Sequence, residues 1–222
     1  MRPSVSVLQL DTQFPRVPGD VACPDTFNQE IEIIRISGAK VDTIVTSRPG
    51  DIDIQPFEEA VKKARGDVIV TSCGFLSFWQ DHLQSCSTRP FISSSLIAMD
   101  HLSVRFAPED LLILTFDAQS LNERHLGTHH SYAHSIRGMG SNMHLRDVIS
   151  TGHSELNLDR ASGELVDLVR NEGADRYKHI LLECTNMPPY KNALRREFGL
   201  PVSDILTEIE RVCPGTITPA FL

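Results

Sequence analysis

The sequence lacks any long hydrophobic segment. Its uncharged apolar runs, such as Leu111–Leu114, are far shorter than the roughly 18–20 residues that a membrane-spanning helix requires. The start of the chain, Met1-Arg2-Pro3 followed by an alternating stretch to Leu10, also lacks the apolar core and the small-residue cleavage site of a signal peptide. These absences exclude a membrane-spanning protein, and we expect a cytoplasmic location.

Positive charge is scarce as well. The chain has 21 Lys and Arg residues against 29 Asp and Glu residues, and its formal net charge is −8. A nucleic-acid-binding protein needs a basic face to displace counterions from the phosphates, so we expect no nucleic-acid partner. With 41% apolar and 23% charged residues, the composition is typical of a soluble globular protein that buries a core.

Cysteine is sparse, and its pattern excludes a disulfide framework. There are five cysteines, an odd number, and none are closely spaced. Most free cysteines are small buried hydrophobic residues, so a chemical role needs a particular reason. We interpret Cys23, Cys86 and Cys213 as structural.

Short apolar stretches alternate with amphipathic stretches along the chain. This alternation is typical of βα units around a parallel sheet, and it predicts an α/β fold. The predicted strands are 4–10, 30–36, 42–46, 67–72, 111–115 and 179–183, and 118–126 is among the predicted helices.

Two segments share one plan, a polar residue, an apolar run, a second polar residue and a cysteine. They are Asp67–Cys73 and Lys178–Cys184, and their cysteines lie 111 positions apart, half of the 222 residues. This spacing predicts two α/β domains of the same build that face each other. We assign residues 1–107 and 205–222 to the first domain and residues 108–204 to the second.

Cys73 and Cys184 each follow a predicted strand at the point where the chain passes into a helix. In open α/β sheets this carboxyl edge is where ligands bind. The free N–H groups of a following helix would lower a thiol pKa and hold a carboxylate. With one thiol on each side of a cleft, one thiolate could remove a proton and the opposite thiol could return one. The alternative is two inert core cysteines, but their matching contexts favour chemistry.

The segments around these cysteines resemble a known family. Thr71–Leu76 and Glu183–Tyr190, with the loop Asp11–Arg16 and Pro18–Asp20, look like the aspartate/glutamate/hydantoin racemase superfamily. The motifs follow the family's order from residue 11 to residue 190, so the resemblance covers nearly the whole chain. It implies two pseudo-symmetric Rossmann-like domains with an interdomain cleft, and racemisation without pyridoxal phosphate, metal or another cofactor.

The resemblance also implies roles for individual residues. Cys73 and Cys184 would be the acid/base pair at Cα. Asp11 and Thr12 would position the substrate or activate a thiol. The residues implied to hold the substrate carboxylate are Gly74, Thr185 and Asn186.

Two positions depart from the racemase pattern. Gly74-Phe75 follows the first cysteine, where aspartate and glutamate racemases carry Asn-Thr, and Asn186 stands where they usually carry His or Glu. Phe75 therefore replaces a polar substrate contact with an aromatic ring. The Cys-Thr-Asn run also resembles the second motif of maleate cis-trans isomerases, in which one cysteine attacks a double bond. Arylmalonate decarboxylases of the same superfamily keep only one of the two cysteines, so the presence of both argues against that activity.

Hydroxyl and arginine side chains are weaker candidates. Ser94 follows a short strand, and it either caps a helix or offers its hydroxyl to a carboxylate. Thr115 ends the first strand of the second half, just as Asp11 stands at the end of the first strand of the first half. We therefore include Thr115 as a ligand contact. Arg16 and Arg48 could each pair with a second carboxylate, although solvated loop arginines are commoner.

Six of the nine histidines lie between His125 and His153. The pairs His125/His129 and His130/His134 have the i, i+4 spacing that can bind zinc from one helix face. Because no Glu completes an H-E-x-x-H motif, we favour a solvated or cleft-rim cluster, such as a pH-sensitive lid, over a metal site.

Together these observations predict a cofactor-independent amino-acid racemase of the aspartate/glutamate type, an isomerase that acts on a small carboxylate. The alternatives are a maleate-type cis-trans isomerase and a non-catalytic binder of small acids. The sequence leaves open the substrate, the stereochemical preference and the oligomeric state, and a homo-oligomer is compatible with it.

Overall fold

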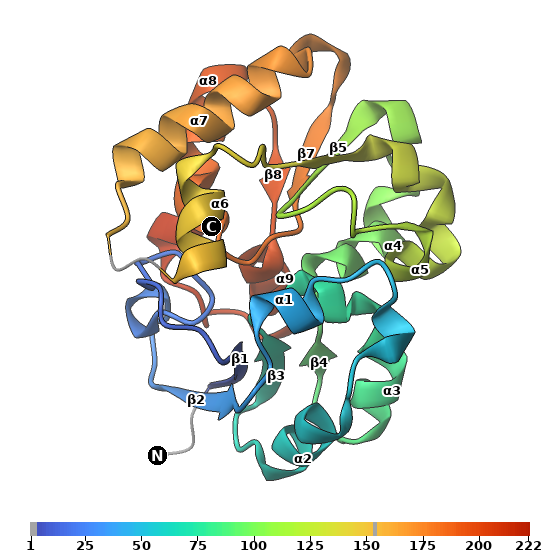
Figure 1. Ribbon diagram of the computed structural model, residues 1–222, viewed down its shortest axis with the longest axis vertical. Coiled ribbons are helices and arrows are strands. Elements are labelled where there is room, and N and C mark those ends of the chain that lie inside the picture. Colours follow the sequence, from blue (N-terminus) through green and yellow to red (C-terminus); the bar gives the residue numbers. More distant parts are fainter. Residues whose placement is uncertain (1–3, 153–154) are drawn as a thin grey trace.

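The structure is a computed structural model that describes residues 4–152 and 155–222. Each half of the chain forms a four-stranded parallel sheet flanked by helices, and the sheets lie in separate lobes (Figure 1). The first sheet has the order β2-β1-β3-β4, and the second has the equivalent order β6-β5-β7-β8. The predicted α/β fold with two domains and parallel sheets is confirmed. The strands are β1 (Val5–Leu10), β2 (Ile31–Ile36), β3 (Val68–Thr71), β4 (Phe91–Ile92), β5 (Leu111–Thr115), β6 (Ile136–Gly138), β7 (His179–Leu182) and β8 (Val202–Ser203).

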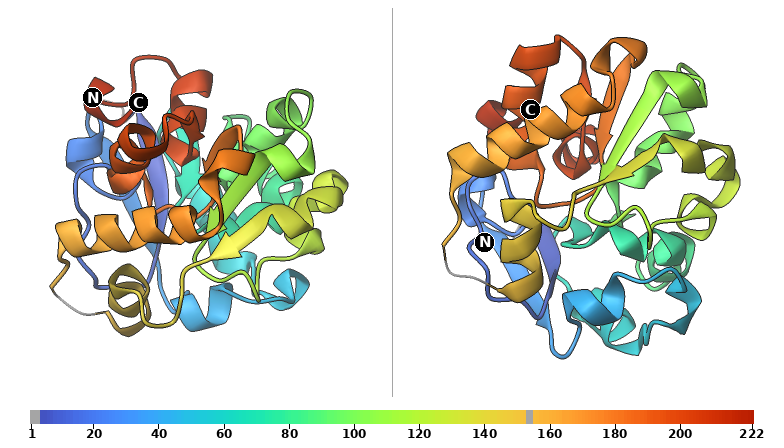
Figure 2. Two further views of the ribbon diagram at one scale, coloured as in Figure 1. Left: turned by 90° about the horizontal axis from the view of Figure 1, so that it is seen from above. Right: turned by 45° about the horizontal axis from the view of Figure 1, so that its top comes forward.

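Helices connect the strands and cover the faces of the sheets (Figures 1 and 2). In the longest of those described, Ala161, Leu165 and Val169 are buried at a spacing of four residues, which presents one apolar face to the sheet. Asn157 caps this helix by accepting a hydrogen bond from Arg160 N–H. The α-helices are α1 (Val41–Ile44), α2 (Gln55–Lys63), α3 (Gln80–Ser85), α4 (Met99–Leu102), α5 (Glu123–Leu126), α6 (His144–Thr151), α7 (Leu158–Asn171), α8 (Lys191–Phe198) and α9 (Ile205–Val212).

The two similar sequence segments occupy equivalent places in two sheets of the same strand order. β3 pairs with β1 in the first sheet, and β7 pairs with β5 in the second. Every residue of β3 and β7 is buried, as expected for parallel strands covered on both faces. Cys73 stands two residues after β3, and Cys184 stands two residues after β7. Each domain therefore carries one cysteine at the same place on its carboxyl edge.

The C-terminal segment packs on the first sheet. Ile205, Leu206 and Ile209 of α9 share a core with Val5 of β1 and Val68 of β3. Close to the end of the chain, a β-bridge joins residue 217 to residue 27. The assignment of 205–222 to the first domain, with boundaries at 107/108 and 204/205, stays a prediction.

Two predicted elements are wrong. Residues 42–46 do not form a strand, because the chain turns into α1 at Val41. Thr43 stabilises this turn, since its hydroxyl accepts a hydrogen bond from Lys40 N–H at 3.0 Å and donates one to Lys40 O at 2.9 Å. The predicted helix 118–126 is reduced to α5, because the Asp117 side chain accepts hydrogen bonds from Gln119 N–H and Ser120 O–H and holds a turn there.

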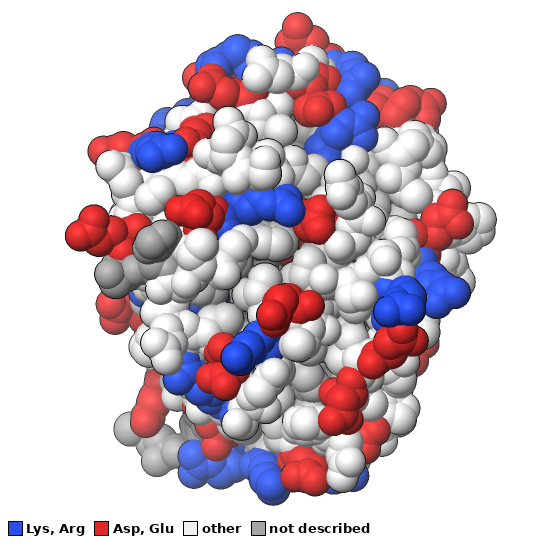
Figure 3. Space-filling model, viewed as in Figure 1, with Lys and Arg blue, Asp and Glu red and all other residues white. Residues whose placement is uncertain are grey.

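The sequence predicts that neither a nucleic acid nor a membrane is a partner of this protein, and two features of the structure are relevant to this prediction. On the face seen in Figure 3, Lys and Arg side chains are interspersed with Asp and Glu. In the described part of the chain, no helix combines the length and apolar character needed to cross a bilayer. The expected absence of nucleic-acid and membrane partners and the cytoplasmic location stay predictions.

Candidate active site

A cavity lies between the carboxyl edges of the two sheets. It is narrow, with a volume of about 30 Å³. Both domains contribute to its wall. We call it the inner cavity, and it is lined by Leu10, Thr12, Phe14, Arg16, Val41, Val45, Ser72, Cys73, Gly74, Phe75, Phe116, Ile149, Glu183, Cys184, Thr185 and Asn186.

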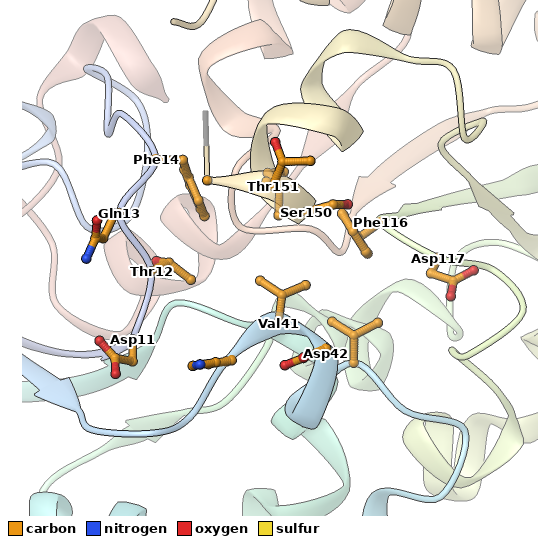
Figure 4. Close-up of a pocket in the computed structure, with 14 residues that line it drawn as sticks. Asp11, Thr12, Gln13, Phe14, Val41, Asp42, Phe116, Asp117, Ser150 and Thr151 are labelled. Carbon is orange, nitrogen blue, oxygen red and sulfur yellow. The ribbon is translucent and has the colours of Figure 1, made fainter. Parts of the chain in front are cut away.

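A second cavity opens outside the inner one and shares part of its wall. Phe14 and Phe116 lie on opposite sides of this outer cavity, with Val41 of α1 between them (Figure 4). The apolar residues common to both cavities form a collar, which consists of Phe14, Val41, Val45, Phe116 and Ile149. A ligand that enters the inner cavity from the outer one therefore passes this collar.

The two cysteines are related by the pseudo-symmetry of the fold. Both line the inner cavity, and their exposed fractions are only 8% and 6%. Cys184 Sγ lies 3.8 Å from Asn186 Oδ1, to which the thiol donates. The structure thus brings the two predicted catalytic cysteines to one cavity.

Burial has a larger effect on the pKa of these thiols than the backbone N–H groups have, and it raises both pKa values. Burial raises the pKa of Cys73 to about 12, and the negative Glu183 adds to this, while the Phe75 N–H and Arg16 oppose it. The pKa of Cys184 is also raised, first by burial and then by Glu183. The lowered thiol pKa expected from the sequence is therefore wrong for the unliganded protein, and both cysteines are protonated at neutral pH.

Glu183 is a component of the site that our interpretation of the sequence missed. Its side chain is fully buried and lines the inner cavity. Oε2 accepts a 2.6 Å hydrogen bond from the hydroxyl of Thr115, whereas Oε1 has no hydrogen-bond partner among the described residues. Burial raises the pKa of Glu183 to about 7, although the Thr115 bond acts in the opposite direction. The signal in the sequence is a charged residue that directly follows the apolar run of β7.

Glu183 also explains the glycine beside the first cysteine. A Cβ at Gly74 would lie 2.0 Å from Glu183 Oε1 and 2.7 Å from the Glu183 carbonyl oxygen. Gly74 is therefore required by the close approach of the second domain, and its Cα lies against the carboxyl group.

Arg16, which lines the inner cavity, forms an ion pair with Asp20. Arg16 NH1 lies 3.2 Å from Asp20 Oδ1, and its NH2 donates to the Thr12 hydroxyl at 3.0 Å. The guanidinium lies 4.1 Å from the centre of the Phe14 ring. Arg16 Nε is buried and has no partner among the described residues. A donor on Arg16 thus remains free to meet an anionic ligand group in the inner cavity.

The other predicted contacts are distributed over several places. Asn186 Nδ2 donates to Asp20 Oδ2 at 2.7 Å, so its amide is held by protein groups. Asp11 lines the outer cavity and pairs with Arg35 at 3.5 Å. Ser94 lines neither cavity and caps a 3-10 helix by accepting a hydrogen bond from Leu96 N–H. Of the predicted site residues, those that line the inner cavity are Thr12, Cys73, Gly74, Phe75, Cys184, Thr185 and Asn186. Thr115 is connected to the cavity through its hydrogen bond to Glu183.

The histidines do not form one cluster. His125 is buried beside Phe75, with 5.2 Å between ring centres, and burial lowers its pKa to about 4. His129 pairs with Asp100 at 2.9 Å, and His153 lies outside the described residues. Over residues 4–152 and 155–222, no group of three or more His, Cys, Asp or Glu side chains could hold a metal ion. The predicted absence of a metal and of a cofactor stays a prediction.

Comparisons with solved structures identify the fold. Arylmalonate decarboxylase superposes with a TM-score of 0.55 at 15% identity, covering 97% of this chain and 96% of that one. Allantoin racemase from Klebsiella pneumoniae gives a TM-score of 0.54 at 16% identity, covering 94% and 87%. The protein thus has the same fold as arylmalonate decarboxylase and allantoin racemase. No protein-family model matches the chain.

Comparisons with curated proteins point to a different activity from the predicted one. Dimethylsulfoniopropionate lyase 5 of Emiliania huxleyi (strain CCMP1516) is 29% identical over 99% of this chain and 47% of its own length. Dimethylsulfoniopropionate lyase of Durusdinium sp. clade D is 26% identical over 98% of this chain and 77% of its own length. The chain thus spans about half the length of the first relative and about three quarters of the second.

These names correct the function predicted from the sequence. The curated relatives that cover the chain are lyases, so the predicted amino-acid racemase is wrong. The predicted isomerase class is wrong for the same reason. The broader prediction that the protein is an enzyme agrees with both sets of comparisons. The expected small carboxylate substrate also agrees, because the relatives are named after a propionate. Nothing in the comparisons bears on a homo-oligomer, which stays a prediction.

Proposed function

We propose that this protein is a lyase that cleaves dimethylsulfoniopropionate, the compound named in its curated relatives. This substrate carries a carboxylate at one end and a dimethylsulfonium group on the β carbon. In the elimination, a base removes a proton from the carbon beside the carboxylate, and the electron pair of that C–H bond forms a C=C bond. The C–S bond breaks, so dimethyl sulfide leaves with its electron pair, and acrylate and one proton remain.

The observation that carries the proposal is a pair of buried thiols at one small cavity, in a chain whose curated relatives are lyases. A thiolate is a suitable base for the proton beside a carboxylate. The raised pKa of both thiols is consistent with a cationic substrate. A sulfonium group held beside the sulfur would stabilise the thiolate and lower the thiol pKa when the base is needed.

The apolar part of the cavity wall fits the methyl groups of a sulfonium. An amino acid would bring an ammonium group that needs acceptors, whereas the methyl groups of a sulfonium need only apolar surface. Phe75 provides a ring in the inner cavity at the position where racemases carry a polar residue. The faces of aromatic rings attract cations, which favours a sulfonium group at Phe75. The free Arg16 Nε then remains for the substrate carboxylate.

An elimination needs one base, and the charges around the two thiols favour Cys73. Arg16 acts on Cys73 and lowers its pKa, whereas Asp20 and Cys73 act on Cys184 and raise its pKa further. We therefore assign proton removal to Cys73. Cys184 lies beside the substrate and completes the wall. The two cysteines would then contribute unequally, unlike the pair of a two-base racemase.

The test is release of dimethyl sulfide from dimethylsulfoniopropionate, measured by gas chromatography, with acrylate measured by NMR. We expect both products from the wild type and a loss of at least about 100-fold in kcat in Cys73→Ala. Cys184→Ala should lose less. Cys86→Ala is the matched control, because Cys86 is outside both cavities. A folded wild type that releases neither product would overturn the proposed function, and full activity in Cys73→Ala would remove the assigned base.

A further inference from the structure

The inner cavity contains an unpartnered carboxyl oxygen that the elimination described above does not use. Glu183 is 0% exposed, and its Oε1 has no hydrogen-bond partner among the described residues. A buried polar atom without a partner is costly, so its presence at a cavity points to a ligand that completes it. The Glu183 side chain lines the same cavity as both cysteines.

The contacts of Glu183 decide which of its oxygens lacks a hydrogen-bond partner. Oε2 is occupied, because the Thr115 hydroxyl donates to it at 2.6 Å. Oε1 lies against Gly74, where a Cβ would approach it to 2.0 Å, so the carboxyl group lies directly beside the first cysteine loop. A hydroxyl that donates to Oε2 leaves Oε1 as the oxygen that can carry a proton.

We propose that Glu183 acts as a neutral carboxylic acid whose Oε1–H donates a hydrogen bond to the carboxylate of the substrate. The inference rests on the proposed function, because it names how that same site stabilises the reaction. When the thiolate takes the proton from the α carbon, the electron pair of the broken C–H bond spreads onto the substrate carboxylate. That carboxylate then carries more than one negative charge until the C–S bond breaks. Glu183 keeps its proton throughout, so the overall products are unchanged.

A donor from a neutral acid is stronger against this developing charge than against the resting carboxylate. It would act together with the free Nε of Arg16, which lines the same cavity. An ionised Glu183 would instead repel the carboxylate. The roles of the two residues are therefore complementary, since a permanent cation and an uncharged acid line the same cavity.

The surroundings of Glu183 favour the neutral form. Burial raises the pKa of the carboxyl group to about 7. The titratable groups near it are Cys73 and Cys184, both of which it influences electrostatically, and their negative forms would disfavour its ionisation. Arg16 acts on Cys73, and Asp20 acts on Cys184. A thiolate formed during catalysis thus keeps Glu183 protonated.

The decisive comparison is between Glu183→Gln and Glu183→Leu. Gln keeps an uncharged donor in the same place, so we expect Glu183→Gln to retain most of the kcat/KM for dimethyl sulfide release at pH 6. Glu183→Leu has no donor, and we expect a loss of at least about 100-fold. The wild type should lose the neutral acid as the pH rises through 7. The ratio of kcat/KM at pH 8 to that at pH 6 should therefore be roughly tenfold higher in Glu183→Gln than in the wild type.

A binding experiment separates this inference from the proposed function. Propionate has the carboxylate but no leaving group, and calorimetry can measure its affinity even if no lyase activity is found. We expect the wild type to bind propionate about tenfold more weakly at pH 8 than at pH 6, with no such change in Glu183→Gln. Equal activity losses in the Gln and Leu variants, or pH-independent propionate binding in the wild type, would overturn the role of Glu183. If Glu183→Leu does not fold, the two pH comparisons with Glu183→Gln decide the question.

Discussion

The hydroxyl of Thr185 donates a hydrogen bond to the carbonyl oxygen of Ser72 at 2.7 Å. These residues stand next to the two cysteines, one in each domain, and both are buried. The bond therefore joins the two cysteine loops directly. It also uses the Thr185 hydroxyl, which the family resemblance had given to the substrate carboxylate.

This bond predicts a difference between two substitutions of Thr185. Thr185→Ser keeps the hydroxyl and should keep both stability and activity. Thr185→Val is similar in shape but leaves the Ser72 carbonyl without its donor. We expect a stability loss of about 1 kcal/mol and a roughly tenfold fall in kcat, because the two loops are no longer held together. Chemical denaturation and dimethyl sulfide release measure the two effects. Equal kcat in both variants would show that the bond does not position the loops.

Gly74 predicts a steric effect. The added methyl group of Gly74→Ala would meet the Glu183 carboxyl oxygen at 2.0 Å and the Glu183 backbone oxygen at 2.7 Å. We expect a loss of about 1–3 kcal/mol in unfolding free energy, measured by chemical denaturation. Gly163→Ala is the control, because nothing lies within 4 Å of a Cβ there. Removing the Glu183 side chain as well should not restore stability fully, since the backbone contact remains.

The buried Glu183 predicts a pH dependence of stability. Its pKa in the folded protein, about 7, is raised above the ordinary value of 4.5. The folded protein therefore holds a proton that the unfolded chain has lost, and this stabilisation disappears as the pH rises through 7. Between pH 4.5 and pH 8 the wild type should lose on the order of 3 kcal/mol relative to Glu183→Gln. Denaturation of both proteins at several pH values checks this, and parallel stability curves would contradict it.

Lys191 and Asp204 predict the effect of breaking a buried ion pair. Their Nζ and Oδ2 atoms lie 2.8 Å apart, and both side chains are almost fully buried. Lys191→Met leaves the Asp204 carboxylate buried without its cation, which should cost about 3–5 kcal/mol. Lys178→Met is the control, because Lys178 forms an exposed pair with Asp110, and its loss should stay within about 1 kcal/mol. Similar losses in the two variants would show that burial does not decide the effect.

Ser94 separates a structural role from a substrate contact. It accepts a hydrogen bond from Leu96 N–H and lies outside both cavities. Ser94→Ala should therefore cost about 1 kcal/mol of stability and leave the KM for the sulfonium substrate unchanged. A raised KM with unchanged stability would instead assign Ser94 to the substrate site.

Much of the fold could be predicted because it depends on local patterns. The apolar runs that became β3 and β7 are buried on both faces, and such runs are recognisable without a structure. The prediction failed at 42–46, where β-branched residues suggest a strand. There the Thr43 side chain satisfies the backbone of Lys40 and starts a helical turn. Side-chain hydrogen bonds of this kind are not visible in apolar patterning.

The site was only partly predictable, because burial and charge there depend on both domains. Cys73 and Cys184 were found by their matching positions at strand ends. Glu183 was missed, since a Glu at the end of a strand is ordinarily solvated, and only the second domain's approach to Gly74 encloses it. Arg16 stayed a weak candidate because loop arginines are commonly solvated, and only the folded structure places it in the wall of the inner cavity.

Amino-acid order alone was sufficient for two repeated α/β units and for one cysteine at the carboxyl edge of each, because strand burial and strand-end position are properties of short segments. Tertiary structure decided the protonation of the thiols, the enclosure of Glu183 and the collar in front of the cavity. These properties arise from desolvation and from contacts between residues more than 100 positions apart, such as Ser72 and Thr185. The chemistry of this site therefore depends on how the two halves meet.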